Sequence, residues 1–483
     1  MFYIWIVAGY LALLFIVALS KMRAVKIQED FMVAGRKTPT LLLVGTLVCT
    51  WIGSGSLFGS AGLGFRSGFS ALWFSAGAWV GIAIVYFLAH RVRRIAQYTL
   101  SDILETRYNQ WARLLGTLTI IIAYLTIAGY QFRGGGRLLH ILTGMDPILG
   151  GAISCAVTIL FTMIAGLVSI IAVDLFNGIV MTLGVVIGVP LLLAKVGGWQ
   201  QVQTLPADHF TVFGDNDAVW ALGIFLPTFF LLLGESSMYQ KFFSAKDEHA
   251  ARRAVIGMII GVVVIESLLY GLAIIGSAKY FQQAPFVNPD GAFNDSQTET
   301  IILYVARHDL PMLAGGLMMA AAVAIILSTA NTYLMIPSTN IARDLYQRFI
   351  NPNVSPERIV VIQRLLIVAL GIIAYVAATF FESILKMALT AYTMIGAGIT
   401  PALLAAFLWK RASVAGGVAS IAAGMLVTVA ITTANFILPE PLMETDYIII
   451  PAASASILTL IVVSLLTPPP PEEKWKLFWT ETK

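Results

Sequence analysis

The chain has 483 residues, of which 58% are hydrophobic and only 12% are charged. Soluble proteins carry roughly a quarter charged residues, so this composition excludes an ordinary soluble protein and indicates a polytopic membrane protein. The net charge of +4 and the two cysteines, Cys49 and Cys155, both in apolar runs, give no reason to expect a nucleic-acid partner, a disulfide framework or a cysteine-rich metal site.

Apolar runs of about 20 residues, each enough to cross a bilayer core of roughly 30 Å, recur along the whole chain. The fold class is therefore all-α, with thirteen predicted transmembrane helices. The first run lacks a basic leading region and a cleavage site, so we interpret it as a retained helix. The predicted spans are 2–19, 41–64, 71–90, 112–142, 148–166, 171–195, 217–237, 254–280, 311–336, 359–379, 384–408, 414–436 and 448–467.

An odd number of spans places the two ends of the chain on opposite sides of the membrane. Most of the 30 lysines and arginines fall in alternate loops, and basic loops face the cytoplasm. We therefore expect a multi-pass protein of the plasma (inner) membrane, with the N-terminus outside and the C-terminus in the cytoplasm. The loops assigned to the cytoplasm are at 21–37, 91–113, 241–253, 343–364 and 410–411, together with the tail.

Two spans are predicted to be interrupted. The segment 51–65, "WIGSGSLFGSAGLGF", carries five glycines, and each costs a helix interior roughly 1 kcal/mol relative to alanine. In the span 311–336, Ser328, Thr329, Asn331 and Thr332 precede Pro337. Interrupted or polar helices in two halves of a transporter indicate an ion and substrate site near the membrane midplane. The alternative is packing, since serine and threonine bond back to their own helix and small residues serve helix contacts.

Four segments carry a family resemblance. They are "EDFMVAGRKTP" (29–39), "GLVSIIAVDLFNG" (166–178), "GESSMYQKFFSAKDEHAARRA" (234–254) and "ILSTANTYLM" (326–335). In this order, and with the predicted topology, they resemble the sodium:solute symporter family, which contains the bacterial proline symporter and the sodium-coupled sugar transporters. The resemblance covers essentially the whole chain.

The resemblance implies a leucine-transporter-type fold of two inverted five-helix repeats with two interrupted helices. The first flanking helix and its loop would occupy 1–40, and inverted repeat 1 would occupy 41–195. An extracellular loop at 196–216 would lead to inverted repeat 2 at 217–408. The C-terminal flanking helices would occupy 409–467, and the cytoplasmic tail 468–483.

The resemblance also implies a site for sodium, the coupling ion and the one cofactor expected. Its ligands would be the backbone carbonyls of Cys49, Ile52 and Ile325 and the hydroxyls of Ser328 and Thr329. Sodium is a hard cation that prefers several oxygen ligands, and a neutral set binds it weakly enough for release. Asp174 would attract sodium leaving the site, unless it is an ordinary helix-terminal acid.

Candidate substrate residues lie in and around the first interrupted helix. The glycines would let this helix unwind beside the sodium ligands, with its exposed backbone facing the substrate. The alternatives are that Glu235 caps its own helix and that Trp73 is a packing or interface residue. The set comprises Gly53, Ser54, Gly55, Ser56, Trp73, Ser75, Arg133 and Glu235.

An arginine pair at the end of the fourth span also bears on the substrate. In "YQFRGGGRLLH" (130–140), Arg133 lies within the span, where a charge is costly and usually marks a pathway. Arg133 could hold a substrate carboxylate through two hydrogen bonds. Alternatively, Arg133 pairs structurally with Glu266 or Asp174, and Arg137 extends outward to the interface.

These features favour a sodium-coupled secondary active symporter that imports a small amino acid or carboxylate, with proline-like compounds as the leading example. Sugar is disfavoured because Leu72-Trp73 and Leu232-Leu233 stand where the sugar branch has a Glu-Trp pair and a tyrosine gate. A carrier of neutral solutes (sugar or polyol, urea, nucleobase) and a transporter-like sensor remain alternatives. There are no catalytic residues to suggest an enzyme. The expected partners are the solute and the lipid bilayer, with no nucleic acid and no obligatory protein partner evident.

Overall fold

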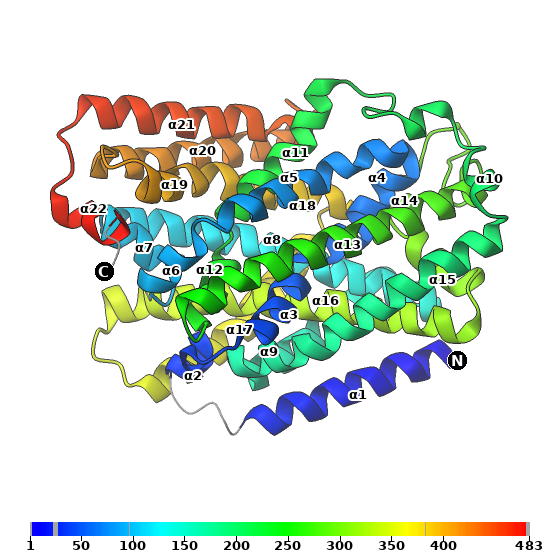
Figure 1. The fold of residues 1–483 in the computed structure, drawn as a ribbon, viewed down its shortest axis with the longest axis horizontal. Helices are drawn as coiled ribbons and strands as arrows, with labels where there is room; N and C mark the ends of the chain where they lie inside the picture. The colour runs from blue at the N-terminus through cyan, green and yellow to red at the C-terminus, as the bar shows by residue number, and fades with distance from the viewer. Residues whose placement is uncertain (1, 23–27, 96, 382, 480–483) are drawn as a thin grey trace.

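The computed structural model describes residues 2–22, 28–95, 97–381 and 383–479. Within these ranges the regular structure is helical, apart from two isolated β-bridges. Long helices run side by side along one axis in an elongated bundle (Figure 1). Helix α1 (Phe2–Met22) begins at the end where α10 (Trp199–Val202) lies, here called the N-terminal end, and α22 (Glu472–Trp479) lies at the opposite end (Figure 1).

In the part of the chain that the structure describes, twelve stretches are long and apolar enough to cross a membrane. The apolar helix α3 (Thr40–Trp51) is too short to count by itself, so the predicted number of thirteen spans stays a prediction. The twelve are Phe2–Ser20, Gly55–Val85, Gln110–Thr143, Pro147–Ile164, Gly166–Val196, Ala218–Ser244, Glu248–Tyr280, Met312–Ile350, Pro356–Ala378, Ile384–Leu408, Val414–Ile437 and Thr445–Leu466.

The first predicted interruption is confirmed. Helix α3 stops at Trp51, Ile52 is extended (φ −78°, ψ 99°), and the chain resumes as a π-helical turn, Gly55–Gly59, and α4 (Ser60–Ser67). Close approach explains the glycines, because a Cβ on Gly53 would lie 2.8 Å from both Gln131 Nε2 and Thr329 Cγ2. The helix is therefore broken where its backbone meets two other helices.

The second predicted interruption is wrong in its place. The span 311–336 belongs to one continuous helix, α16 (Met312–Asn340), because its polar side chains bond to neighbouring helices and leave its own backbone ladder intact. The break instead lies at Gly234-Glu235, between α11 (Ala218–Leu233) and α12 (Ser236–Ser244). Glu235 is extended (φ −68°, ψ 100°) and accepts the Ser237 N–H, so it caps the start of α12.

The centre of the bundle is formed by α8 (Gln110–Thr143), α16 and α9 (Pro147–Val196), which pack against one another. Gly166, at φ 54° and ψ 176°, divides α9 into two helices. Helices α1, α20 (Val414–Ile437) and α21 (Ile449–Leu466) lie along the edges of the bundle (Figure 1). The other α-helices are α2 (Gln28–Val33), α5 (Leu72–Val85), α6 (Ala89–Ile95), α7 (Leu100–Arg107), α13 (Glu248–Tyr280), α14 (Asp295–Thr298), α15 (Ile301–His308), α17 (Pro356–Ala378), α18 (Ile384–Gly398) and α19 (Thr400–Leu408).

Candidate functional site

The broken end of α3 meets the polar segment of α16. Thr329 Oγ1 lies 3.2 Å from the carbonyl oxygens of Cys49 and Ile52 and 3.4 Å from that of Thr50. The last carbonyls of a helix have no partner within the helix, so the break leaves these oxygens directed at the hydroxyl. Ile325, one turn earlier on α16, is buried. Predicted cation ligands from the two helices therefore face one another.

Asp174 lies beside this cluster. Ser328 Oγ donates to Asp174 Oδ1 at 2.5 Å, and Thr46 Oγ1 donates to Oδ2 at 2.6 Å. Asp174 is 1% exposed and lies in the interior of α9, so the interpretation of an ordinary helix-terminal acid is wrong. A buried carboxylate thus orients one of the two hydroxyls predicted to bind the cation.

Lys241 is also buried beside the cluster, although the sequence placed it in a cytoplasmic loop. Its side chain is 1% exposed, and Nζ donates to the Thr46 carbonyl at 2.8 Å and to Thr50 Oγ1. Lys241 belongs to α12, which follows the break at Gly234-Glu235 and is buried along its whole length. In the sequence, Lys241 follows the predicted span 217–237, as a loop residue would, so its burial is apparent only from the fold.

A second polar group surrounds the break in α3. The Ser54 N–H donates to Gln131 Oε1 at 2.8 Å. A Cβ on Gly55 would lie 2.7 Å from Tyr392 Oη, and Tyr392 Oη is 3.2 Å from Tyr130 Oη. The predicted substrate residues Gly53, Ser54 and Gly55 therefore lie against α8 and α18, whose residues Tyr130, Gln131 and Tyr392 were not predicted from the sequence.

Two buried carboxylates flank this region. Glu266 Oε1 accepts from Ser56 Oγ at 3.0 Å and from Trp51 Nε1 at 3.1 Å, while Trp79 Nε1 donates to Oε2 at 2.8 Å. Ser75 Oγ lies 3.3 Å from Tyr270 Oη, close to the same carboxylate. Glu266 was considered only as a partner for Arg133, but its bonds are to the predicted substrate residue Ser56 and to two tryptophans.

Glu235 forms the second carboxylate. It accepts from Tyr124 Oη and, at 3.0 Å, from Tyr333 Oη, in addition to capping α12. The cavity between Glu235, Trp51, Thr50 and Lys241 has a volume of only about 10 Å³. A water molecule needs roughly that much space, so the centre is closed to an organic solute in this conformation.

Trp73 and Arg133 do not join the central group. Trp73 Nε1 donates to the Val212 carbonyl at 2.9 Å, and its ring stacks on Phe213 in a loop. Arg133 donates through Nη1 to the Ala378 carbonyl at 3.0 Å. On α8, Gly134 faces Ser54, whereas Arg133 points to α17 because successive helical residues are about 100° apart. The carboxylates of Glu266 and Asp174, the alternative partners suggested for Arg133, accept hydrogen bonds from other side chains on α3, the Gly55–Gly59 turn and α16.

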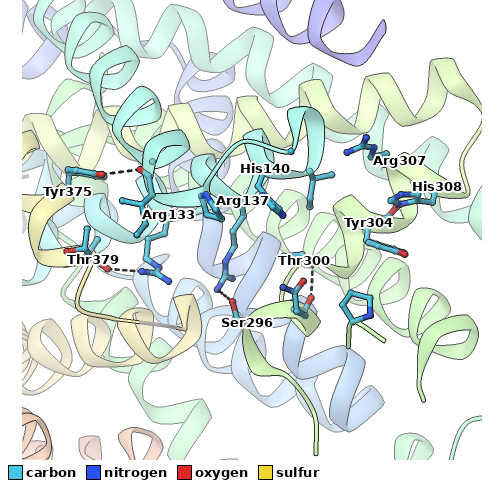
Figure 2. A pocket seen from close by; sticks show the side chains of 18 residues that line it. Arg133, Arg137, His140, Ser296, Thr300, Tyr304, Arg307, His308, Tyr375 and Thr379 are labelled. Carbon is cyan, nitrogen blue, oxygen red and sulfur yellow. Dashed lines mark hydrogen bonds between the residues drawn. The ribbon is translucent and has the colours of Figure 1, made fainter. Parts of the chain in front are cut away.

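Arg133 lines a separate cavity of about 530 Å³, here called the arginine cavity (Figure 2). It lies at the N-terminal end, between the end of α8, the start of α9, α15 and the end of α17. Arg137 lies on its wall and pairs with Glu299, so the expectation that Arg137 extends outward is wrong. The charged or titratable side chains on its lining are Arg133, Arg137, His140, Tyr304, Arg307, His308 and Tyr375.

Comparisons with known proteins agree with this architecture. The model of the sodium:solute symporter family matches residues 31–424. The sodium/proline symporter of Staphylococcus aureus is 24% identical over 451 residues, covering 88% of this chain and 84% of that protein. Sodium/proline symporter 2 of Staphylococcus saprophyticus is 23% identical, covering 88% and 85%. The solved structure of a Na⁺-coupled sialic acid symporter in a substrate-bound outward-open state aligns with a TM-score of 0.80 and 17% identity, covering 97% of this chain and 98% of that one.

Proposed function

This chain belongs to the sodium:solute symporter family and performs sodium-coupled symport of a small solute, and we propose that its solute is an amino acid or small carboxylate, with proline-like compounds as the leading example. The names of the two staphylococcal relatives support this choice. The central group supports an amino acid in particular, because Glu235 and Glu266 are acceptors suited to an ammonium or secondary amine. The broken start of the α4 segment would present backbone amides to the carboxylate.

The proposed sodium ligands are the carbonyls of Cys49, Ile52 and Ile325 and the hydroxyls of Ser328 and Thr329. The observation that supports this site is the position of Thr329 Oγ1 within 3.2 Å of two of these carbonyls. These are hard oxygen donors from two separate helices.

We further propose that Asp174 and Lys241 assist sodium release. Both contact Thr46, Asp174 through the hydroxyl and Lys241 through the carbonyl. Asp174 already orients Ser328, so it offers the departing cation a negative charge next to its ligand. Lys241 then supplies the balancing positive charge when sodium has left, which reduces the cost of a buried carboxylate.

Orientation and repeat boundaries follow the same proposal. The N-terminal end faces outside and the tail faces the cytoplasm of the plasma membrane, because most basic residues lie in loops on the opposite side from the N-terminus. The inverted repeats correspond to 41–195 and 217–408. Their first helices are the two that are broken, at Ile52 and at Glu235.

Uptake by the purified protein in liposomes tests the substrate. A panel of labelled amino acids, carboxylates, sugars and nucleobases is supplied with an inward sodium gradient or with equal sodium on both sides. We expect gradient-dependent accumulation of proline or a related amino acid, and its reduction in Glu235→Gln. Accumulation of a sugar or nucleobase alone would contradict the proposed substrate class while leaving sodium coupling intact.

A further inference from the structure

The arginine cavity is separate from the central group and has no role in the proposed transport site. It opens at the N-terminal end, whereas the central residues on α3, α12 and α13 do not line it. Its volume of about 530 Å³ lies within the range of roughly 300–1,000 Å³ typical of small-molecule sites. The cavity is therefore large enough for an organic solute, unlike the closed centre.

The charge on the lining has one sign. Arg133 and Arg137 come from α8 and Arg307 from α15, while the described lining residues include no aspartate or glutamate. Figure 2 shows these three arginines distributed around the pocket. Cavities lined by charges of one sign raise the local concentration of the opposite ion, so this cavity attracts anions.

The carboxylate that pairs with Arg137 belongs to Glu299, which does not line the cavity. Glu299 pairs with Arg137 and also accepts from Ser383 Oγ at 2.7 Å, the Ile384 N–H at 3.1 Å and the Leu385 N–H at 3.0 Å. These bonds fix Glu299 against the start of α18. It can neutralise Arg137 from behind, but it cannot fill the cavity.

The remaining lining favours an organic anion over an inorganic one. Apolar surface is supplied by Ile141, Pro147, Ile148 and Pro285. Hydroxyls and amides between the arginines offer further hydrogen bonds; these side chains are Ser296, Gln297, Thr300, Tyr304 and Tyr375. Arginine is the side chain best suited to bind a carboxylate through paired hydrogen bonds.

We propose that the arginine cavity is a second binding site, which takes a small organic carboxylate with an apolar body. Arg133 and Arg137, one turn apart on α8, bind the carboxylate, and the apolar residues contact its body. Arg307, at the other end of the cavity (Figure 2), adds positive charge that attracts the anion. Arg137 links this site to the rest of the protein, because a carboxylate that reaches it competes with Glu299. Occupancy would thus weaken the ion pair between Arg137 and Glu299. Glu299 holds the start of α18 and packs against α4, where a Cβ on Gly62 would lie 2.9 Å from Glu299 Cγ.

Calorimetric titration of the full-length protein, in nanodiscs of zwitterionic lipid and without sodium, tests the proposal. Potassium benzoate is the probe, and benzamide is its neutral counterpart of similar shape. A hydrogen bond to a charged group is worth roughly 1.5–3 kcal/mol, so benzoate should bind at least about tenfold more tightly than benzamide. Arg133→Gln should weaken benzoate binding about tenfold, and Arg307→Gln, which removes only a more distant charge, should weaken it less.

The matched control is Arg253→Gln, since Arg253 is an exposed arginine near the opposite end of the bundle. This variant should change the affinity for benzoate by less than about twofold, which is too little for the loss of a hydrogen bond to a charged group. Unfolding temperatures measured for all variants show whether each of them folds. Equal binding of benzoate and benzamide, or equal loss in the control, would overturn the proposal.

Nanodiscs containing phosphatidylglycerol provide a second arm. If that lipid displaces benzoate from wild type but not from Arg133→Gln, a lipid phosphate is the occupant and the carboxylate assignment is wrong.

Discussion

The Glu299 carboxylate and the groups bonded to it, which are Arg137, Ser383 and the first amides of α18, should stabilise the folded protein. Glu299 is 1% exposed and Arg137 is 6% exposed. Glu299→Gln keeps the size of the side chain but removes the charge opposite Arg137 and turns an amide group toward donors that need an acceptor. Breaking a buried ion pair by removing one partner costs about 3–5 kcal/mol. We therefore expect this variant to unfold at a clearly lower temperature and the start of α18 to open locally.

Thermal unfolding in detergent and hydrogen–deuterium exchange of residues 383–390 measure the two effects. The matched control is Glu357→Gln, because Glu357 is an exposed acid in the first turn of α17, where a charge is worth about 0.3–1 kcal/mol. Equal shifts in the two variants, or exchange at 383–390 that matches wild type, would refute the role of Glu299.

Glu299 also determines how the stabilisation by its carboxylate changes with pH. Burial alone would raise the pKa of the Glu299 carboxyl, but Arg137, the Leu385 amide and the Ser383 hydroxyl outweigh it and hold the pKa below its usual range. The folded-state pKa is therefore lower than the unfolded value of about 4.3. The resulting stability is present above that value and is lost as pH falls through the folded pKa. The difference between wild type and Glu299→Gln should accordingly shrink in acid, and a constant difference would contradict this account.

Further substitutions test the central group. In Gly53→Ala, the added Cβ would lie 2.8 Å from Thr329 Cγ2. Overpacking of about 1–3 kcal/mol should then raise the sodium concentration for half-maximal uptake about tenfold. The control is Gly271→Ala, whose Cβ would have nothing within 4 Å and which should leave that concentration unchanged. Asp174→Asn should also weaken sodium activation of uptake, because Ser328 loses its charged acceptor; an unchanged sodium titration would exclude this role. Lys241→Met should lower the unfolding temperature, and the double variant with Asp174→Asn should lose less than the sum of the two, whereas additive losses would show that the two charges are independent.

Much of the architecture was predictable because it depends on length and local composition. Apolar runs of bilayer length define the helices wherever they occur, and the glycines at 53 and 55 predicted the break in α3. The predicted break at 311–336 was wrong because polar residues in a membrane helix can mark a break or can bond to a neighbouring helix. Thr329 and its neighbours bond to other helices, which requires an intact α16 and not a broken one.

The site was predictable in part. Residues within one segment, such as Ser54 and Ser56, could be singled out because their segment is unusually rich in glycine and serine. Gln131, Tyr392 and Lys241 were missed because each lies in an unremarkable local sequence and becomes significant only when α8, α18 and α12 pack around the break. Arg133 was predicted as a substrate residue because its charge lies within a span, with a structural ion pair as the alternative. One position along α8 separates the face toward Ser54 from the face toward α17, and sequence periodicity could not tell which face lines the centre.

Sodium activation of uptake in liposomes tests the central claim most directly. Thr329→Val keeps the shape of the side chain and removes the hydroxyl that meets the carbonyls of Cys49 and Ile52. The control is Ser338→Ala, whose hydroxyl donates within its own helix to the Met335 carbonyl. The account predicts that Thr329→Val raises the half-maximal sodium concentration at least tenfold, about 1.4 kcal/mol, while Ser338→Ala does not. A wild-type sodium titration in Thr329→Val would contradict it.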